Sequence, residues 1–176
     1  AAVHIVDPVT NEYRESTAQD LYDAARLVDN LDNIHFYQRT MVCRDVVDNK
    51  EMDLNTLYGS LAGTVKHVGT SFSDPSHVAD CFDLIHMVAG GEEKWLERPF
   101  VSNSNCFVVP PMKFAEESCI TMEHCVRAGM PVLMLSAGQA GATAPAPLAL
   151  TIVQAVAECL SGVVYVNAMR PGHPAI

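Results

Sequence analysis

The chain has 176 residues and a formal net charge of −10 at pH 7; 49% of its residues are hydrophobic and 18% are charged. This length is enough for one domain with a core of its own. The negative charge argues against a nucleic-acid-binding protein, because phosphate binding needs clustered lysine and arginine. No apolar run of about eighteen residues is free of polar interruption, so the sequence predicts no membrane span, and it shows no signal peptide.

The six cysteines include no CxxC pair. Cys81, Cys119 and Cys159 fall on apolar helical stripes, where cysteine acts as a small hydrophobic residue. We therefore expect free, reduced thiols and a cytoplasmic protein. A zinc site is the alternative, but no tight spacing of cysteine and histidine supports it, and we expect no bound metal.

Short apolar runs alternate along the chain with longer segments whose apolar residues have helical spacing. The predicted strands are 3–6, 34–42, 64–72, 100–109 and 132–135. The predicted helices are 17–31, 49–62, 73–89 and 113–128, and a last one begins at Leu148. Thr17 and Asp20 form a capping box in sequence, and the second helix is expected to bury Leu54, Leu57, Tyr58 and Leu61.

The predicted strands begin about every 32 residues, a spacing typical of β/α units in a parallel sheet. Five consecutive units favour either a doubly wound sheet or most of a (β/α)₈ barrel. The last residues, after a Pro-Gly-His-Pro turn, resemble the start of a further strand. We expect the chain to be a segment of a longer protein.

The stretch 131–174 contains the fifth unit: a strand, a small-residue turn over 136–142, and a helix. Thr143 is expected to cap the helix start, with Pro145 and Pro147 where no N–H is needed. The helix is apolar on both faces, so we expect it to be buried nearly all round. No GxGxxG or GxxxxGK[ST] pattern occurs. The turn is interpreted as a close-packing turn, and a phosphate-binding nest is the alternative.

Three collinear stretches resemble the trimethylamine methyltransferase family. The densest is GQAGATAPAPLALTIVQAVAECLSGVVYVNAMRPGHP, residues 138–174; the others are TAQDLYDAARLVDNLDNI, residues 17–34, and VAGGEEKWLERPFVSNSNCFVVPP, residues 88–111. This resemblance implies a partial (β/α)₈ TIM barrel of about five β/α units plus the edge of a sixth strand. Residues 1–176 would then be a single segment of a barrel domain in a longer chain.

The resemblance also implies an activity. Family members move a methyl group from a methylated amine to the cobalt of a corrinoid carried by a separate protein, a one-carbon reaction of the methanogenesis type. One branch uses pyrrolysine and takes trimethylamine; another lacks it and takes quaternary amines such as glycine betaine. The pyrrolysine position is expected beyond Ile176, so this sequence does not assign the branch. We expect a corrinoid protein as partner, no tightly bound cofactor, and a homo-oligomer.

Ligands bind barrels at the carboxyl ends of the strands. A quaternary ammonium can be held there by aromatic faces, and a betaine carboxylate by hydrogen-bond donors. The catalytic residues are not assigned by the sequence. The candidate substrate-binding residues at four predicted strand ends are Tyr37, Thr40, Ser71, Phe72, Asn103, Asn105, Ser136 and Gln139.

Each candidate also has a structural interpretation. Phe36 and Tyr37 alternate, so only one of them can face the barrel interior. Asn103 and Asn105 share one face of a strand and need partners there.

For three further polar side chains, the simplest interpretation is a structural role. Gln154 and Glu158, four residues apart, are expected to form a structural polar pair, and Arg170 to bind helix-end carbonyls or a carboxylate. Two other classes of function remain: a different barrel enzyme such as a metal-dependent lyase, or a non-catalytic binding or assembly module.

Overall fold

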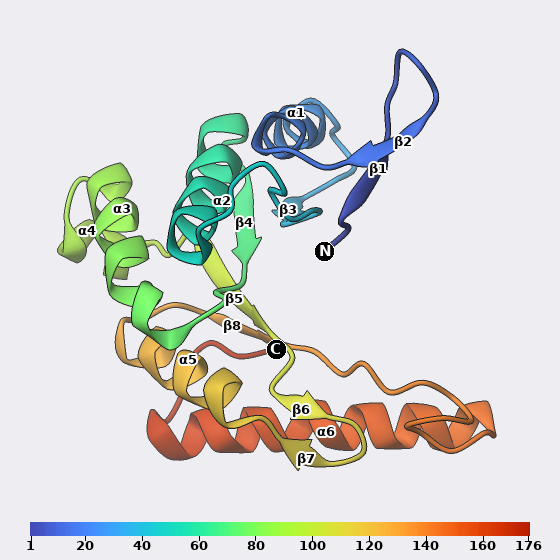
Figure 1. Cartoon of the computed structure of the whole chain (residues 1–176). Coiled ribbons are helices and arrows are strands. Elements are labelled where there is room, and N and C mark those ends of the chain that lie inside the picture. Colours follow the sequence, from blue (N-terminus) through green and yellow to red (C-terminus); the bar gives the residue numbers. More distant parts are fainter. The chain divides into compact units, whose positions relative to one another are not determined.

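The computed structural model describes all residues, 1–176, which form two compact units, Ala1–Val101 and Ser102–Ile176. Strands β3 (Phe36–Gln38) and β4 (His67–Thr70) lie in the first unit, and β5 (Val101–Asn105) leads into the second unit, which contains β8 (Val132–Met134) (Figure 1). The pairs β3–β4 and β5–β8 are parallel. Helices alternate with these strands along the chain, so the predicted α/β class is confirmed.

The first predicted strand is not part of these parallel pairs, although Ala2, just before it, forms a parallel bridge with Met41. Strand β1 (His4–Val6) pairs with β2 (Tyr13–Glu15) in an antiparallel hairpin. The chain turns back because Asp7 Oδ1 accepts hydrogen bonds from the N–H groups of residues 9 and 10, and Asn11 adopts a left-handed conformation at φ 63°. The prediction of five regularly spaced parallel strands was therefore only partly right at its first member, because residues 4–6 pair antiparallel and only Ala2 makes the parallel contact.

Helices α1 (Ala18–Asp29) and α2 (Asn49–Gly63) lie side by side in the first unit (Figure 1). The capping box of Thr17 and Asp20 is present at the start of α1, as predicted. The predicted apolar face of α2 was partly wrong, because Tyr58 is 62% exposed. The buried face instead combines Leu57 with small and polar residues: Asp53, Thr56, Gly59, Ser60 and Gly63.

Small residues let the two helices approach closely, and this contact makes a testable prediction. A Cβ at Gly63 would lie 2.6 Å from Ala25 Cβ and 2.8 Å from the backbone oxygen of Tyr22. We expect Gly63→Ala to lower the free energy of unfolding by about 1–3 kcal/mol through overpacking. Gly59→Ala is the control: its Cβ would meet its nearest atom at 3.5 Å, so we expect about 0.5–1 kcal/mol of stabilisation in urea unfolding. Equal effects would contradict the close packing.

The rest of the first unit follows the predicted order. The 3₁₀ helix η1 (Pro75–His77) is capped by Asp74, whose side chain accepts from the Ser76 N–H. It leads into α3 (Val78–Ala89), whose buried stripe is Val78, Cys81, Phe82 and Ile85. The charged stretch after the Gly90-Gly91 break forms a short helix, α4 (Glu92–Glu97), anchored by the fully buried Trp95.

The second unit divides the predicted strand 100–109 into two parts. After β5, a separate hairpin of β6 (Val108–Val109) and β7 (Lys113–Phe114) leads into α5 (Glu116–Arg127). The core of this unit joins the hairpin, α5, β8 and the last helix. Its buried members are Phe107, Val108, Met122, Val126, Val132, Met134 and Val166.

The last helix, α6 (Leu148–Met169), is not buried nearly all round as predicted. Only Glu158, Gly162 and Val166 are buried, and Leu148 is 70% exposed. Its length and composition alone would allow it to cross a membrane, a test that core helices of soluble proteins also pass. The predicted Thr143 cap was also wrong: Pro147 is the N-cap, and Thr143 Oγ1 instead accepts from the Gln139 N–H.

Residues 174–176 run beside β8 in the manner expected of a following strand. The N–H of Val132 donates to the oxygen of Pro174, and the N–H of Met134 donates to the oxygen of Ile176. A parallel bridge joins Val132 and Ala175. Helix α6 and this bridge together form one further crossover connection.

Candidate active site at the strand ends

The alternation along β3 decides which of its two aromatic residues faces the helices. Tyr37 is 1% exposed and packs with Leu21 and Ala25 of α1, whereas Phe36 is 45% exposed. Because successive side chains of a strand point to opposite faces, Phe36 lies on the face that α1 does not cover. Tyr37 therefore belongs to the helix-facing side of β3.

The hydroxyl of Tyr37 is occupied by protein partners. It donates to the backbone oxygen of Leu21 at 3.1 Å, and it lies 3.0 Å from Thr40 Oγ1. A phenol has one proton, so Thr40 is the donor in the second contact. Burial raises the pKa of Tyr37. The structure thus brings Tyr37 and Thr40 together in a contact that fixes the end of β3 against α1.

Ser71 and Phe72 directly follow β4. The backbone oxygen of Ser71 accepts from Arg39 Nη1 at 3.0 Å, which ties the ends of β3 and β4 together. Both Ser71 and Phe72 are partly exposed. These two residues are therefore accessible at the carboxyl end of a parallel strand, where ligands meet such sheets.

A buried carboxylate that the sequence did not predict as a site residue holds the next part of this loop. Asp53 Oδ2 accepts from the Ser73 N–H at 2.9 Å, from Ser73 Oγ at 2.8 Å and from His77 Nδ1 at 2.9 Å. The Asp53 side chain is fully buried, and its Oδ1 atom has no hydrogen-bond partner. An acidic residue one turn before Leu57, on the inward face of α2, was the available signal. Asp53 and His77 place the loop after β4 against α2.

The two asparagines of β5 share a face, as the alternation predicted. Asn105 Nδ2 donates to Asn103 Oδ1 at 3.1 Å and to the backbone oxygen of Ser118 in α5 at 2.9 Å. Both asparagines are buried, and Asn105 Oδ1 is buried without a partner. The amides therefore pair with each other and with the start of α5, and one acceptor remains unused.

Ser136, two residues after β8, contacts a second buried carboxylate. Its Oγ donates to Glu158 Oε2 at 2.6 Å. Glu158 is 0% exposed and also accepts from Gln154 Nε2 at 3.0 Å, which confirms the predicted pair on α6. The alternation of side chains along β8 agrees with this contact, because Val132, Met134 and Ser136 lie on the same side of the strand, the side that faces α6.

Gln139 organises the glycine turn through its backbone. Its oxygen accepts from the N–H groups of Ala142, Thr143 and Ala144 at 2.9–3.1 Å. These N–H groups are thus used within the turn and are not free to bind a phosphate. This supports the interpretation of the segment as a close-packing turn rather than as a phosphate-binding nest. The Gln139 side chain is exposed.

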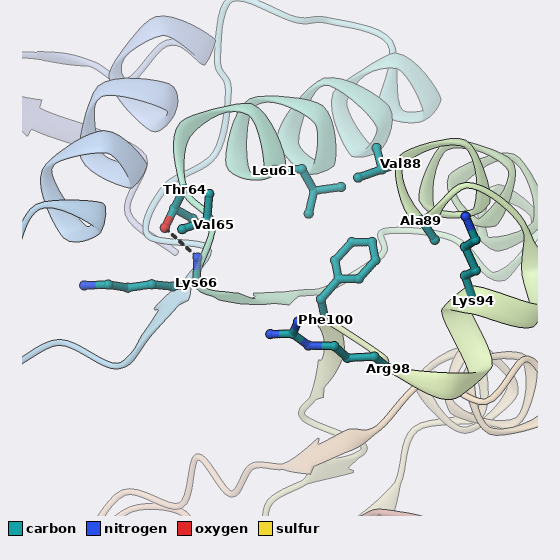
Figure 2. Close-up of a pocket in the computed structure, with 9 residues that line it drawn as sticks. All are labelled: Leu61, Thr64, Val65, Lys66, Val88, Ala89, Lys94, Arg98 and Phe100. Atoms are coloured by element: carbon teal, nitrogen blue, oxygen red, sulfur yellow. Dashed lines mark hydrogen bonds between the residues drawn. The ribbon is translucent and has the colours of Figure 1, made fainter.

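A cavity of about 410 Å³ lies at the opposite, amino edge of the first unit (Figure 2). Residues 64–66 before β4 and Phe100 before β5 contribute to it. In Figure 2 the side chain of Lys66 extends away from the cavity, and its Nζ donates to three backbone oxygens at 2.7 Å, those of Val28, Leu31 and Ile34. Since ligands of parallel α/β folds bind at carboxyl ends, this cavity is not the candidate active site.

The cysteines are all free thiols, as predicted. Burial raises the pKa of the Cys43 thiol, and burial together with the Asp53 charge raises that of Cys81 to about 12. A thiol with a raised pKa is a poor nucleophile near neutral pH. Cysteine chemistry at these two positions is therefore not supported.

Comparison with known proteins decides the family. A model of the trimethylamine methyltransferase family matches residues 1–176. The chain belongs to the trimethylamine methyltransferase family. It is 32% identical over 180 residues to a trimethylamine methyltransferase of Desulfitobacterium hafniense (strain DSM 10664 / DCB-2), covering 99% of this chain and 35% of that relative.

Two further relatives are named for different substrates. A trimethylamine methyltransferase of Methanosarcina thermophila is 30% identical over 159 residues, covering 90% of this chain and 33% of the relative. A glycine betaine methyltransferase of Desulfitobacterium hafniense (strain Y51) is 29% identical over 164 residues, covering 93% of this chain and 34% of the relative. The chain spans about a third of the length of the curated relatives it matches.

Proposed function

We propose that this chain is part of a methyltransferase that moves a methyl group from a methylated amine to the cobalt of a corrinoid carried by a partner protein. The observation that carries the proposal is the family match over residues 1–176. The named relatives act, by their names, on trimethylamine or glycine betaine. The α/β fold, with polar and aromatic residues at parallel strand ends, is compatible with a barrel that holds a small amine.

Methyl transfer from a quaternary ammonium requires positioning of the substrate more than it requires proton transfer. A quaternary ammonium already has a neutral amine as its leaving group. The carbon–nitrogen bond breaks with its electron pair remaining on nitrogen, and the electron pair of the reduced cobalt forms the new bond to carbon. The enzyme then contributes by holding the cation in line with the metal, through proximity and orientation.

The surroundings of the candidate substrate-binding residues suggest different roles for them. Ser71 and Phe72 are accessible, and an aromatic face such as that of Phe72 attracts a methylated ammonium. Tyr37, Thr40 and Asn103 are held by protein partners. We propose that these three position the strand ends. Asn105, Ser136 and Gln139 complete the proposed set.

Methyl transfer to free reduced cobalamin tests the function. The full-length protein would be incubated with trimethylamine, glycine betaine, proline betaine or carnitine, and methylated cobalamin would be followed by absorbance. We expect formation with at least one of them, and the substrate that reacts assigns the branch. No methylation with any of the four, in a protein shown to be folded, would count against the proposed activity.

We also propose a barrel domain that continues outside residues 1–176, a cytoplasmic location and a homo-oligomer. The barrel continuation and the homo-oligomer are supported by the short span relative to the curated relatives and by the exposed apolar side of α6, where Val153 is 63% and Val164 is 69% exposed. The free cysteines support the cytoplasmic location. Such a face is covered by other protein in a soluble molecule.

A prediction follows for the isolated polypeptide 1–176. Uncovered α6 and an open sheet edge should cause self-association, because both offer surface for pairing. We expect oligomers or aggregates in sedimentation experiments and strong binding of a hydrophobic dye. The full-length protein, measured at the same concentration, should bind little dye. A monodisperse monomer of 1–176 would contradict the prediction.

A further inference from the structure

Glu158 is a buried carboxylate in the middle of an apolar helix. It is 0% exposed. Three neutral groups donate to it: Ser136 Oγ at 2.6 Å, the Met112 N–H at 3.0 Å and Gln154 Nε2 at 3.0 Å. It thereby joins the β6–β7 hairpin, the segment after β8 and α6 at one point.

The charge of Glu158 is not balanced within the chain. None of the ion pairs of the structure involves it. Burial raises the pKa of Glu158, but the hydrogen bonds from Ser136, Met112 and Gln154 outweigh burial and hold the pKa below its usual value. The group is therefore ionised near neutral pH. A buried charge without a counter-ion is unfavourable, so buried charges are normally paired.

This carboxylate also determines what Ser136 can offer to a ligand. An ionised carboxylate only accepts hydrogen bonds, so the single hydroxyl proton of Ser136 is directed at Glu158. The 2.6 Å distance is typical of a strong charge-assisted bond. Ser136 then presents lone pairs at the carboxyl end of β8, with a negative charge directly behind it.

We propose that Glu158 is a positioning residue that makes the carboxyl end of β8 attract the cationic head of the substrate and exclude a carboxylate. The inference rests on the proposed function and adds to it: the ammonium group lies toward Ser136, and a betaine carboxylate lies away from this edge. The attraction acts through Ser136 and through space, since Coulomb interactions are strong where water is excluded.

The test compares a cation without a carboxylate to a betaine. Binding of tetramethylammonium and of glycine betaine to the full-length protein is measured by calorimetry for the native protein and for Glu158→Gln, with thermal unfolding as the check of folding. Removing the charge should weaken tetramethylammonium about tenfold or more, and glycine betaine by less than about threefold, because the betaine also loses a repulsion. Equal weakening of both ligands, or no change, would overturn the proposal.

Two further variants keep the proposal falsifiable if Glu158→Gln does not fold. Glu158→Asp retains the charge and should retain the preference between the two ligands. Ser136→Ala should weaken tetramethylammonium and glycine betaine to within about threefold of each other, because Ser136 faces the ammonium head that both ligands share and makes no hydrogen bond to the carboxylate. If Ser136→Ala weakened glycine betaine about fivefold or more beyond its effect on tetramethylammonium, Ser136 would donate to the betaine carboxylate, and the proposal would be wrong.

Failure of the inference and failure of the proposed function are distinguishable in these measurements. If the native protein methylates cobalamin but the ligand preference does not respond to Glu158→Gln, only the inference fails. If the native protein binds tetramethylammonium and shows the expected shift, yet methylates no cobalamin with any amine, the site holds cations and the proposed reaction is wrong.

Discussion

Replacing Asp53 with alanine is expected to lower the free energy of unfolding by about 3 kcal/mol or more. The change removes the acceptor for the Ser73 N–H, for Ser73 Oγ and for His77 Nδ1, which all bind Asp53 Oδ2 at 2.8–2.9 Å. The Asp53 carboxylate is fully buried, so water does not replace it. Urea unfolding followed by circular dichroism measures the loss.

Two variants serve as controls for this result. Asp53→Asn keeps one oxygen as acceptor and should lose about half as much or less. Asp48→Ala removes an exposed carboxylate that caps the same helix by accepting from the Glu51 N–H at 2.9 Å, and should lose about 1 kcal/mol. If Asp53→Ala lost no more than Asp48→Ala, the buried network would contribute little.

The Asp53 network also bears on the candidate site. Ser71 and Phe72 lie on the loop that Asp53 holds against α2. If the loop is released from α2, the side chains of Ser71 and Phe72 should no longer be held in one orientation. We therefore expect Asp53→Asn, measured well below its unfolding temperature, to weaken substrate binding more than it affects the native far-ultraviolet spectrum.

Replacing Trp95 with alanine is the second change with a large expected effect. Trp95 is fully buried, and its ring packs edge-on against Phe82 at 5.8 Å and Phe100 at 5.5 Å between centroids. We expect a loss of about 3–5 kcal/mol, because a large cavity forms and two aromatic contacts disappear. Circular dichroism is the appropriate probe, since Trp95 is the only tryptophan.

The matched variant is Trp95→Phe, which keeps an aromatic ring of smaller volume. It should lose about 1–2 kcal/mol, clearly less than the alanine variant. Leu96→Ala, at a neighbouring side chain that is 49% exposed, should lose less still. An alanine variant at position 95 as stable as Leu96→Ala would mean that Trp95 does not anchor α4.

The order of the elements could be predicted because it depends on local pattern. Apolar residues at helical spacing located α3, and glycines located its end, since Gly90 and Gly91 adopt positive φ. The side-chain cap at Thr17 was predictable, because Asp20 follows three residues later and completes a capping box. The predicted helix cap at Thr143 was wrong, because the Thr143 hydroxyl instead accepts a hydrogen bond from the backbone N–H of Gln139.

The surroundings of the candidate residues could not be predicted from spacing. Alternation shows that Phe36 and Tyr37 face opposite sides, but only the position of α1 shows that Tyr37 is the helix-facing one. Likewise, the apolar composition of α6 predicts burial, yet burial also requires a partner surface, and the residues described here supply it only around Glu158, Gly162 and Val166.

By itself, the sequence determined the family, the α/β class and the approximate order of the strands and helices, because these follow from collinear motifs and local periodicity. Only the tertiary structure decided that two buried carboxylates, Asp53 and Glu158, hold the segments after β4 and β8. Apart from Gln154, four residues before Glu158, the donors to these carboxylates lie 20 to 46 residues away in the chain. Such pairings arise from packing, which brings distant donors together around a charge that must be satisfied once it is buried.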